Sequence, residues 1–285
     1  MDKNNYDLSI VIVNWKVKDL LEKCLTSIYK RPQNLSFEVF VIDNASQDGS
    51  VEMVRKKFSQ AKLIANKENR GFAAANNQGI KKSQGEFILL LNPDTEILDN
   101  TLEKMVNFMH QHRDAGVAGC KLLNLDQTPQ PSVRRFPSLW SQIIILSKLH
   151  HLFLKLISYY LALDLDYSKT QGVDQLMGAF FMIRRKVIEQ IGLLDENFYI
   201  WFEEVDFCKR VKSKGWRIYY TPQAEIIHHQ GQSFKQVLSF EKQKIFNKSL
   251  RYYFKKHHSF FAYLIISMIS PISLFLTYFV QLIRK

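Results

Sequence analysis

The first ninety residues alternate between apolar, β-branched runs and segments with helical spacing. The apolar runs are 8–14, 37–43, 62–66 and 86–92, and the helical segments between them are 18–29, 51–58 and 71–83. Continuous apolar runs are typical of parallel strands that are covered by helices on both faces. The alternation therefore predicts an α/β sheet with right-handed crossover connections.

Polar clusters follow these predicted strands. They are Asn14-Trp15, 43–50, 69–77 and 92–95. The carboxyl ends of the strands in an open α/β sheet form the edge where ligands bind, so we expect the clusters to share one site. The small residues that begin the segment 71–83 would let a phosphate approach the N-terminus of that helix.

Asp94, in Leu91-Asn92-Pro93-Asp94-Thr95, is a candidate metal ligand. A carboxylate that follows a rigid strand can hold Mg²⁺ or Mn²⁺, and the cation neutralises charge on a diphosphate leaving group. The segment taken alone fits an ordinary helix-capping turn better, and Asp43 also suits a capping role. The whole set of strand-end clusters favours the ligand-binding interpretation.

Three acidic residues share one predicted helical turn, namely Glu203, Glu204 and Asp206. One of them can act as a base that takes the proton of an attacking hydroxyl group. The alternative is that acidic residues at a helix N-terminus only complement the helix dipole. His228 follows a later predicted strand, where an imidazole can join a carboxylate on a cation or serve a structural role. Arg134 lies in a proline-rich loop and has a phosphate-binding guanidinium, and a solvated loop is an equal alternative.

Together these segments resemble family 2 glycosyltransferases with the GT-A fold, particularly the bacterial rhamnosyltransferase-like branch. The resemblance covers roughly residues 8–233. Its nucleotide-binding half corresponds to 9–15, 41–50 and 69–77, its metal motif to 91–95, and its acceptor half to 177–184, 192–198 and 201–210. The family motif often has two acidic residues, whereas Asn92 occupies the first position here, which leaves Asp94 to contact the cation.

The resemblance implies a fold, a reaction and a set of site residues. The fold is a Rossmann-like mixed sheet flanked by helices, and the reaction is inverting transfer from a nucleotide-diphosphate sugar with Mg²⁺ or Mn²⁺. Glu204 is the expected base, with Glu203 or Asp206 as orienting alternatives. Asp94 and His228 are the expected metal ligands. The donor-binding residues are expected to be Val13, Asn14, Asp43, Asn44, Asn69, Gly71, Asn77, Asn92 and Asp94.

The C-terminal part predicts membrane association. Residues 259–283 carry no charge and would extend roughly 37 Å as a helix, enough to span a bilayer. Pro271 also fits a helix pair in the interface, and docking on the soluble domain stays open. The net charge of +12, with bases crowded before this stretch, favours an anionic membrane surface over nucleic acid.

We therefore expect a catalytic domain over 1–235 and a basic, apolar tail over 236–285. An apolar helical insertion at about 139–163 either packs on the core or touches the membrane. The expected location is the cytoplasmic face of the membrane, as a peripheral or single-pass protein. The expected acceptor is a saccharide, carried on a polyprenyl lipid, for a cell-surface polysaccharide. Rhamnose is the donor sugar that the resembling branch suggests.

Other protein classes fit the sequence less well. No G-x-G-x-x-G follows the first predicted strand and no Walker A sequence is present, which disfavours a dehydrogenase or a P-loop enzyme. A sugar nucleotidyltransferase would need a glycine-rich, arginine-containing first loop. A catalytically inactive, membrane-docked module for nucleotide sugar or lipid is the remaining alternative. The joint presence of Asp43, Asp94 and Glu204 favours an enzyme.

Overall fold

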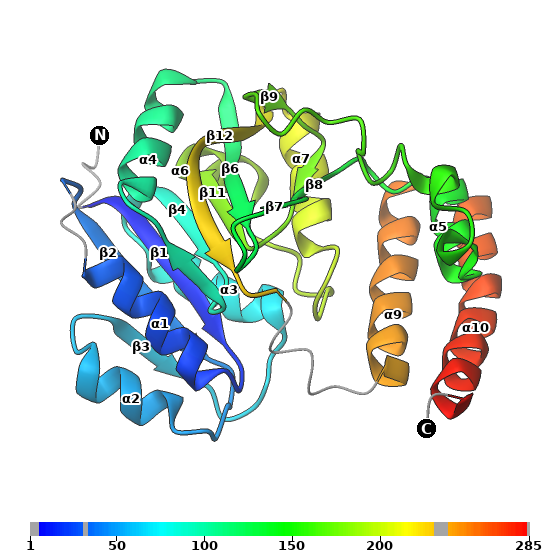
Figure 1. Ribbon diagram of the computed structural model, residues 1–285, viewed down its shortest axis with the longest axis horizontal. Helices are drawn as coiled ribbons and strands as arrows, with labels where there is room; N and C mark the ends of the chain where they lie inside the picture. The colour runs from blue at the N-terminus through cyan, green and yellow to red at the C-terminus, as the bar shows by residue number, and fades with distance from the viewer. Residues whose placement is uncertain (1–5, 31–33, 231–238, 284–285) are drawn as a thin grey trace.

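The computed structural model describes residues 6–30, 34–230 and 239–283, and a mixed ten-stranded sheet forms its centre (Figure 1). The strands along the sheet follow the order β3-β2-β1-β4-β11-β6-β12-β5. The first half is parallel and consists of β1 (Tyr6–Asn14), β2 (Phe37–Asp43), β3 (Lys62–Ala65) and β4 (Gly85–Leu91). These strands agree with the expected alternation, because each is apolar on both faces.

The second half of the sheet is mixed. β11 (Phe180–Arg184) runs antiparallel between β4 and β6 (Ala115–Leu123), and β12 (Arg217–His228) is parallel to β6. β5 (Thr95–Ile97) closes the edge antiparallel to β12. The short strands are β7 (Pro129–Gln130), which pairs with β6, β9 (Gln171–Gly172), which pairs with β12, and β8 (Val133–Arg134), which pairs with β10 (Gln175–Leu176).

Helices cover both faces of the sheet. One face packs against α1 (Lys18–Tyr29), α2 (Ser50–Lys57) and α4 (Thr101–Gln111), and the other against α3 (Phe72–Lys82), α6 (Arg185–Ile191) and α7 (Glu203–Ser213). Side chains alternate along β1 between the two layers, with Ile10 and Ile12 in the first core and Val11 and Val13 in the second. This double burial explains the unbroken apolar run of that strand.

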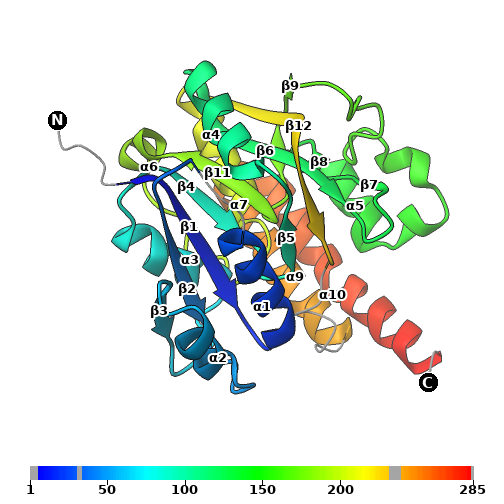
Figure 2. The ribbon, with the colours of Figure 1, turned by 60° about the vertical axis from the view of Figure 1, so that its left-hand side comes forward.

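The C-terminal part is a helical hairpin of α9 (Ser239–His257) and α10 (Phe260–Ile283), which lies at the end of the molecule opposite α2 (Figures 1 and 2). A third apolar core joins the hairpin to α5 (Leu139–Leu146) and to the segment before α7, through Leu146, Phe198, Phe202, Leu250, Phe254 and Ile266. Two 3₁₀ turns, η1 (Leu149–His151) and η2 (Leu154–Ile157), continue the chain after α5. The expected insertion at 139–163 is thus helical.

α10 is one helix that continues through Pro271, and its stretch Phe260–Phe279 is long and apolar enough to cross a membrane. α9 docks on the catalytic part of the chain, as the third core shows. The expected boundary at 235/236 falls in 231–238, which lies outside the described residues.

Candidate active site

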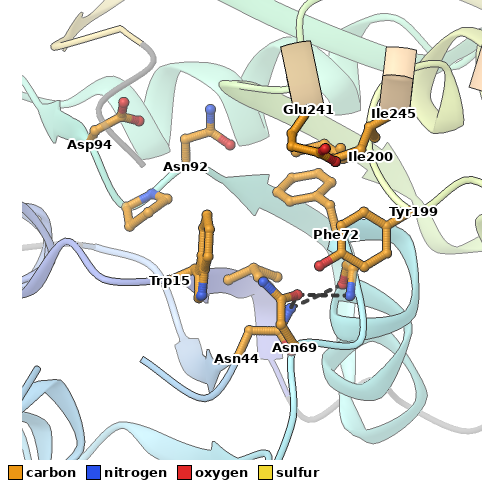
Figure 3. Close-up of a pocket in the computed structure, with 13 residues that line it drawn as sticks. Trp15, Asn44, Asn69, Phe72, Asn92, Asp94, Tyr199, Ile200, Glu241 and Ile245 are labelled. Carbon is orange, nitrogen blue, oxygen red and sulfur yellow. Dashed lines mark hydrogen bonds between the residues drawn. The ribbon is translucent and has the colours of Figure 1, made fainter. Parts of the chain in front are cut away.

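A cavity of about 360 Å³ opens at the carboxyl ends of β1, β2 and β4. It is lined by residues from the strand ends, the start of α3, the segment before α7, and α9, namely Val13, Trp15, Asn44, Asn69, Gly71, Phe72, Asn92, Pro93, Asp94, Tyr199, Ile200, Glu241 and Ile245. In Figure 3, Asn92 and Asp94 lie on one side, with Trp15 below Asn92, and Phe72 and Tyr199 lie on the other. The strand-end clusters therefore do meet, because parallel strands end at one edge.

Asn44 organises the floor of this donor cavity. Its Nδ2 donates to Asn69 Oδ1 at 2.8 Å and to the Gly71 carbonyl at 3.2 Å. Its Oδ1 accepts the backbone N–H of Arg70 at 3.1 Å, and Asn69 Oδ1 also accepts the N–H of Gly71 at 3.0 Å (Figure 3). This network holds the loop before α3 in one conformation, with the first turn of the helix at the cavity.

Gly71 is the residue at which the loop turns into α3. Its φ is +83°, and an added Cβ would lie 2.5 Å from the carbonyl oxygen of Tyr199. The backbone N–H of Phe72 donates to that same carbonyl at 2.6 Å. The close approach and the positive φ together require glycine at this position.

Asn14 and Asp43 lie buried at the ends of their strands. Asn14 Nδ2 donates to Asp43 Oδ1 and to Ser46 Oγ, both at 2.9 Å, and Asp43 Oδ2 accepts the N–H of Ser46 at 3.0 Å. Asn14 Oδ1 has no hydrogen-bond partner among the described residues. The pair fixes the loop after β2, and neither of these expected donor-binding residues is among those that line the donor cavity.

Asn77 joins α3 to the loop before α7. Its Oδ1 accepts the N–H of Leu194 at 3.1 Å, and its Nδ2 donates to the Leu194 carbonyl and to Glu196 Oε1, both at 2.9 Å. Asn77 is buried, and its amide is engaged by protein groups on both sides. The structure therefore gives this expected donor-binding residue a connecting role between two walls of the site.

Asp94 and His228 form the candidate cation site. Asp94 lies in the turn before β5 and His228 lies at the end of β12, and His228 Nε2 is 3.4 Å from Asp94 Oδ1. Both side chains are buried, and the Nε2 has no hydrogen-bond partner in the described part of the chain. The His228 Nδ1 contacts Gln130 Oε1 at 2.6 Å. Such an orphaned buried nitrogen beside a carboxylate suits a divalent cation.

No group of three or more His, Cys, Asp or Glu side chains suited to a metal occurs in residues 6–30, 34–230 and 239–283. Asp94 and His228 would thus supply two ligands, and oxygens of the diphosphate and of water would supply the others. The next residue, His229, has its Nε2 2.7 Å from Glu96 Oε1.

A second cavity of about 460 Å³ adjoins the first and shares Phe72, Asn92 and Ile200 with it. Its walls come from β8, β10, the insertion, the start of α7, the end of β12, and α9. The remaining lining residues are Ser132, Arg134, Tyr160, Gln175, Leu176, Met177, Gly178, Trp201, Phe202, Glu203, Glu204, Val205, His228, Gln230 and Phe246. Asp94 lines the first cavity and His228 the second, so the candidate cation site lies at their junction.

Glu203 and Glu204 enter this second cavity from the first turn of α7. Trp201 and Phe202, directly before them, have φ values of +64° and +71°. Bulky residues in this region cost about 1–3 kcal/mol each and are typical of functional sites. The strained turn brings both carboxyl groups to the cavity wall.

The two glutamates differ in their tendency to hold a proton. Burial, followed by the charge of Glu204, raises the pKa of Glu203 well above its ordinary value. Burial also raises the pKa of Glu204, but its own backbone N–H and the guanidinium of Arg134 oppose that rise. Of the two, Glu203 therefore has the stronger tendency to hold a proton and Glu204 the stronger tendency to be a carboxylate.

Asp206, the third expected acid, lies in a cluster of cations. Its Oδ1 is 2.7 Å from Lys256 Nζ and 2.6 Å from His257 Nε2, and its Oδ2 is 2.8 Å from Arg210 Nε. Burial alone would raise the pKa of Asp206, but the hydrogen bonds from His257 and Lys256 and the charge of Arg210 hold it below its ordinary value. Both carboxylate oxygens are engaged, so Asp206 connects α7 to α9.

The sequence did not indicate that the tail lines the site. Glu241 and Ile245 of α9 line the donor cavity, and Phe246 lines the second cavity. Gln130 and Tyr160 were also missed as residues of the site. The apolar and basic composition of the tail favoured the membrane and carried no sign of its docking.

A parallel sheet half with a strand-end cavity, an Asp and His pair at its rim, and an adjoining cavity with a carboxylate defines a GT-A glycosyltransferase. The chain belongs to glycosyl transferase family 2, whose family model matches residues 9–192. This match confirms the expected family and shows that the protein is an enzyme.

Two relatives and one solved structure illustrate the similarity. A low-salt glycan biosynthesis hexosyltransferase of Haloferax volcanii is 28% identical, over 79% of this chain and 67% of its own. The N-acetylglucosaminyl-diphospho-decaprenol L-rhamnosyltransferase of Mycobacterium tuberculosis is 25% identical, over 79% of this chain and 77% of its own. The mannosyltransferase of Pyrobaculum calidifontis in complex with GDP-Man and Mn²⁺ has a TM-score of 0.61 at 16% identity, over 96% and 73%, which supports the fold.

Proposed function

We propose that the protein transfers a sugar, with inversion, from a nucleotide-diphosphate donor to a hydroxyl of a polyprenyl-linked saccharide. The reaction belongs to cell-surface polysaccharide synthesis at the cytoplasmic face of the membrane, which the tail contacts. The observation that carries this proposal is the pair of adjoining cavities, with Asp94 and His228 at their junction and Glu204 in the second.

The first cavity suits the nucleotide half of the donor. Trp15 offers a flat face for a base or ribose, and the Asn44 and Asn69 network fixes the loop beside it. The first turn of α3 follows Gly71, and the positive end of a helix dipole favours a phosphate. The diphosphate would therefore extend from this helix start toward Asp94.

Asp94 and His228 suit a divalent cation, Mg²⁺ or Mn²⁺. Asp94 supplies a hard oxygen, and the His228 Nε2 supplies a nitrogen that has no other partner among the described residues. When bound, the cation neutralises charge on the diphosphate leaving group. Asn92 lies two residues before Asp94 and lines the same cavity, and its uncharged amide is suited to hydrogen bonding with the donor.

The second cavity suits the acceptor, and Glu204 is the base we assign. As the carboxylate of the pair it can take the proton of the attacking hydroxyl, and its raised pKa brings its basicity closer to that needed near neutral pH. Glu203, whose pKa is raised further by burial and by the charge of Glu204, lies beside the base and can orient the acceptor hydroxyl. Asp206 is left with the role of fixing α7.

The identity of the substrates follows from the relatives only by class. The rhamnosyltransferase of Mycobacterium tuberculosis is named for a lipid-diphosphate acceptor, and this supports a polyprenyl-linked acceptor and rhamnose as the first donor to try. The adjoining position of the insertion, whose Tyr160 lines the acceptor cavity, is compatible with an acceptor that arrives from a membrane.

The test uses the purified full chain with Mn²⁺, a set of nucleotide sugars that includes rhamnose, and a short-chain polyprenyl-diphosphate saccharide in detergent. We expect acceptor-dependent release of nucleoside diphosphate from one donor, and loss of the metal-stimulated part in Asp94→Ala. His110→Ala, which changes an exposed histidine on α4, serves as the control. Full metal stimulation in Asp94→Ala, or no release from any donor by the folded protein, would contradict the proposal.

A further inference from the structure

An exposed apolar ridge runs along one side of α10. Phe261, Met268 and Phe275 are 76%, 74% and 66% exposed, and they follow one another at intervals of seven residues. The other large exposed residues of the helix are Phe260, Leu264, Ile265, Ile272, Tyr278 and Phe279. The opposite side of the helix is buried at Ala262 and Ile266, in the core shared with α9. α10 therefore has one packed face and one open apolar face.

The insertion adds a second group of exposed apolar residues. Leu152 is 75% exposed, and Phe153, Leu154, Leu156 and Tyr159 are also exposed. α5, from which these turns continue, packs against α10, and Lys148 Nζ donates to Gln243 Oε1 of α9 at 2.5 Å. Figures 1 and 2 both show α5 and α10 at the same end of the molecule. Two segments that are more than a hundred residues apart thus carry exposed apolar residues at the same end of the molecule.

α9 presents a stripe of bases. Lys244, Lys248, Arg251 and Lys255 are exposed and occupy successive turns of one side of the helix. The neighbouring side of α9 faces α10, because Asn247 Nδ2 donates to the Ser270 carbonyl at 2.9 Å. The stripe therefore lies beside the helix that carries the ridge.

α9 and α10 run antiparallel along nearly their whole length. The rings of Phe240 and Tyr278 lie 6.1 Å apart near one end of the pair, and the Asn247 to Ser270 hydrogen bond lies toward its middle. If α10 crossed a bilayer in this arrangement, the bases of α9 would enter the hydrocarbon, where Lys and Arg are strongly unfavourable. The packing thus favours α10 lying parallel to the membrane surface.

We infer that α10 lies in the plane of an anionic bilayer, with its apolar ridge among the acyl chains and the exposed residues 152–159 as a second contact. The bases of α9, one helix diameter above, then meet the lipid phosphates. This inference deepens the proposed membrane attachment and rests on that part of the proposed function. The charge of the α9 stripe is what identifies an anionic lipid surface as the partner.

The first test is co-sedimentation of the full chain with phosphatidylcholine vesicles that contain either no anionic lipid or about 30% phosphatidylglycerol. Two multiple variants remove the apolar contacts. The ridge variant combines Phe261→Ser, Met268→Ser and Phe275→Ser, and the insertion variant combines Leu152→Ser and Phe153→Ser. We expect each variant to weaken vesicle binding by about tenfold or more. Lys248→Gln with Arg251→Gln should weaken binding to the anionic vesicles alone, by about fivefold per base at low salt. Leu125→Ser removes a 66% exposed leucine in the turn between β6 and β7 and is the matched control.

The second test measures the depth of a fluorescent label at cysteines placed singly at 261, 268 and 275, with lipid-borne quenchers. Cys24, Cys120 and Cys208 are buried and so are protected from labelling. A helix in the plane gives three similar, shallow depths. A spanning helix places 268 about 10 Å deeper than one of the others, and that result would overturn the inference.

Unchanged vesicle binding in both the ridge and the insertion variants would also overturn the inference. Transfer to a detergent-dispersed acceptor is measured in the same variants. We expect it to be retained, since none of the changed residues lines either cavity. Failed membrane docking with intact transfer separates this inference from the proposed catalytic function.

Discussion

Gln130 Oε1 lies 2.6 Å from His228 Nδ1, and the amide of Gln130 is fixed in that orientation because its Nε2 donates to Asn124 Oδ1 at 2.9 Å. An acceptor at this distance requires that Nδ1 carries the hydrogen. The lone pair of His228 then resides on Nε2, which is the nitrogen beside Asp94. Gln130 thus selects the tautomer that a metal ligand needs.

Gln130→Ala should therefore weaken cation binding although it removes no ligand. We expect the affinity for Mn²⁺, measured by calorimetry in the presence of nucleoside diphosphate, to fall on the order of tenfold. His228→Ala should reduce it further. Gln223→Ala, an exposed glutamine on β12, is the control. Equal affinity in Gln130→Ala and the unmodified protein would contradict the role of Gln130.

Glu204→Gln should remove the proposed base and keep the shape of the second cavity. We expect kcat to fall by roughly 10²- to 10⁴-fold, while donor affinity stays nearly constant, because only proton transfer is lost. Glu203→Gln should have a smaller effect, and Glu189→Gln, on the surface of α6, should have none. A larger loss in Glu203→Gln than in Glu204→Gln would reverse the two assignments.

The acid limb of the kcat/KM profile should report the protonation of Glu204. Because burial raises its pKa, the limb should lie above the ordinary glutamate value of about 4.3. The charge of Arg134 lowers this pKa, so Arg134→Gln should move the limb to higher pH. Lys104→Gln, an exposed cation on α4, is the control. A limb that stays in place or moves to lower pH would argue against Glu204 as the titrating group.

Asp206→Asn should loosen α9 from α7. Asp206 is fully buried and contacts Arg210, Lys256 and His257. The substitution takes the carboxylate partner away from these cations, so we expect the free energy of unfolding to fall by about 3 kcal/mol near neutral pH. Urea denaturation measures this change, with Glu52→Gln on α2 as an exposed control. A destabilisation no greater than that of the control would contradict the connecting role.

The same carboxylate gives a pH dependence whose sign is fixed. The folded pKa of Asp206 lies below its unfolded value, so the folded protein binds fewer protons there. This stability is fully present above the unfolded pKa, about 3.9, and is lost as the pH falls through the folded value. Asp206→Asn should therefore lose its difference from the unmodified protein in acid.

The first half of the fold was predictable because its signals are local. The strands and helices from β1 to β4 follow the predicted ranges closely, since each strand is apolar on both faces. In the second half, the continuous run 175–184 is divided between two strands, because β10 ends at Leu176 to pair with β8 and β11 begins at Phe180 between β4 and β6. The predicted strand before His228 is the end of a longer strand, β12 (Arg217–His228), which has a register shift between Thr221 and Glu225. Pairing partners far along the chain decide these features.

The site was predictable where strand ends meet and less so where side chains turn inward. Val13, Asn44 and Asp94 line the donor cavity as expected of strand-end residues. Asn77 and Asp206 have the same polar character in the sequence, but tertiary contacts turn them toward protein partners. A one-dimensional pattern does not contain that choice, because it depends on which loop or helix packs against each residue.

The docking of α9 also limits how a soluble form of this enzyme can be made. Membrane-attached enzymes are commonly shortened before the attached segment, but a protein that ends before Ser239 would lose Glu241, Ile245 and Phe246 from the cavity walls. Solubility has to come from polar replacements on the outward side of α10, which keep α9 in place. Under the proposed membrane attachment, α9 lines the cavities and packs against the membrane-contacting α10, so the hairpin and the active site have to be engineered as one unit.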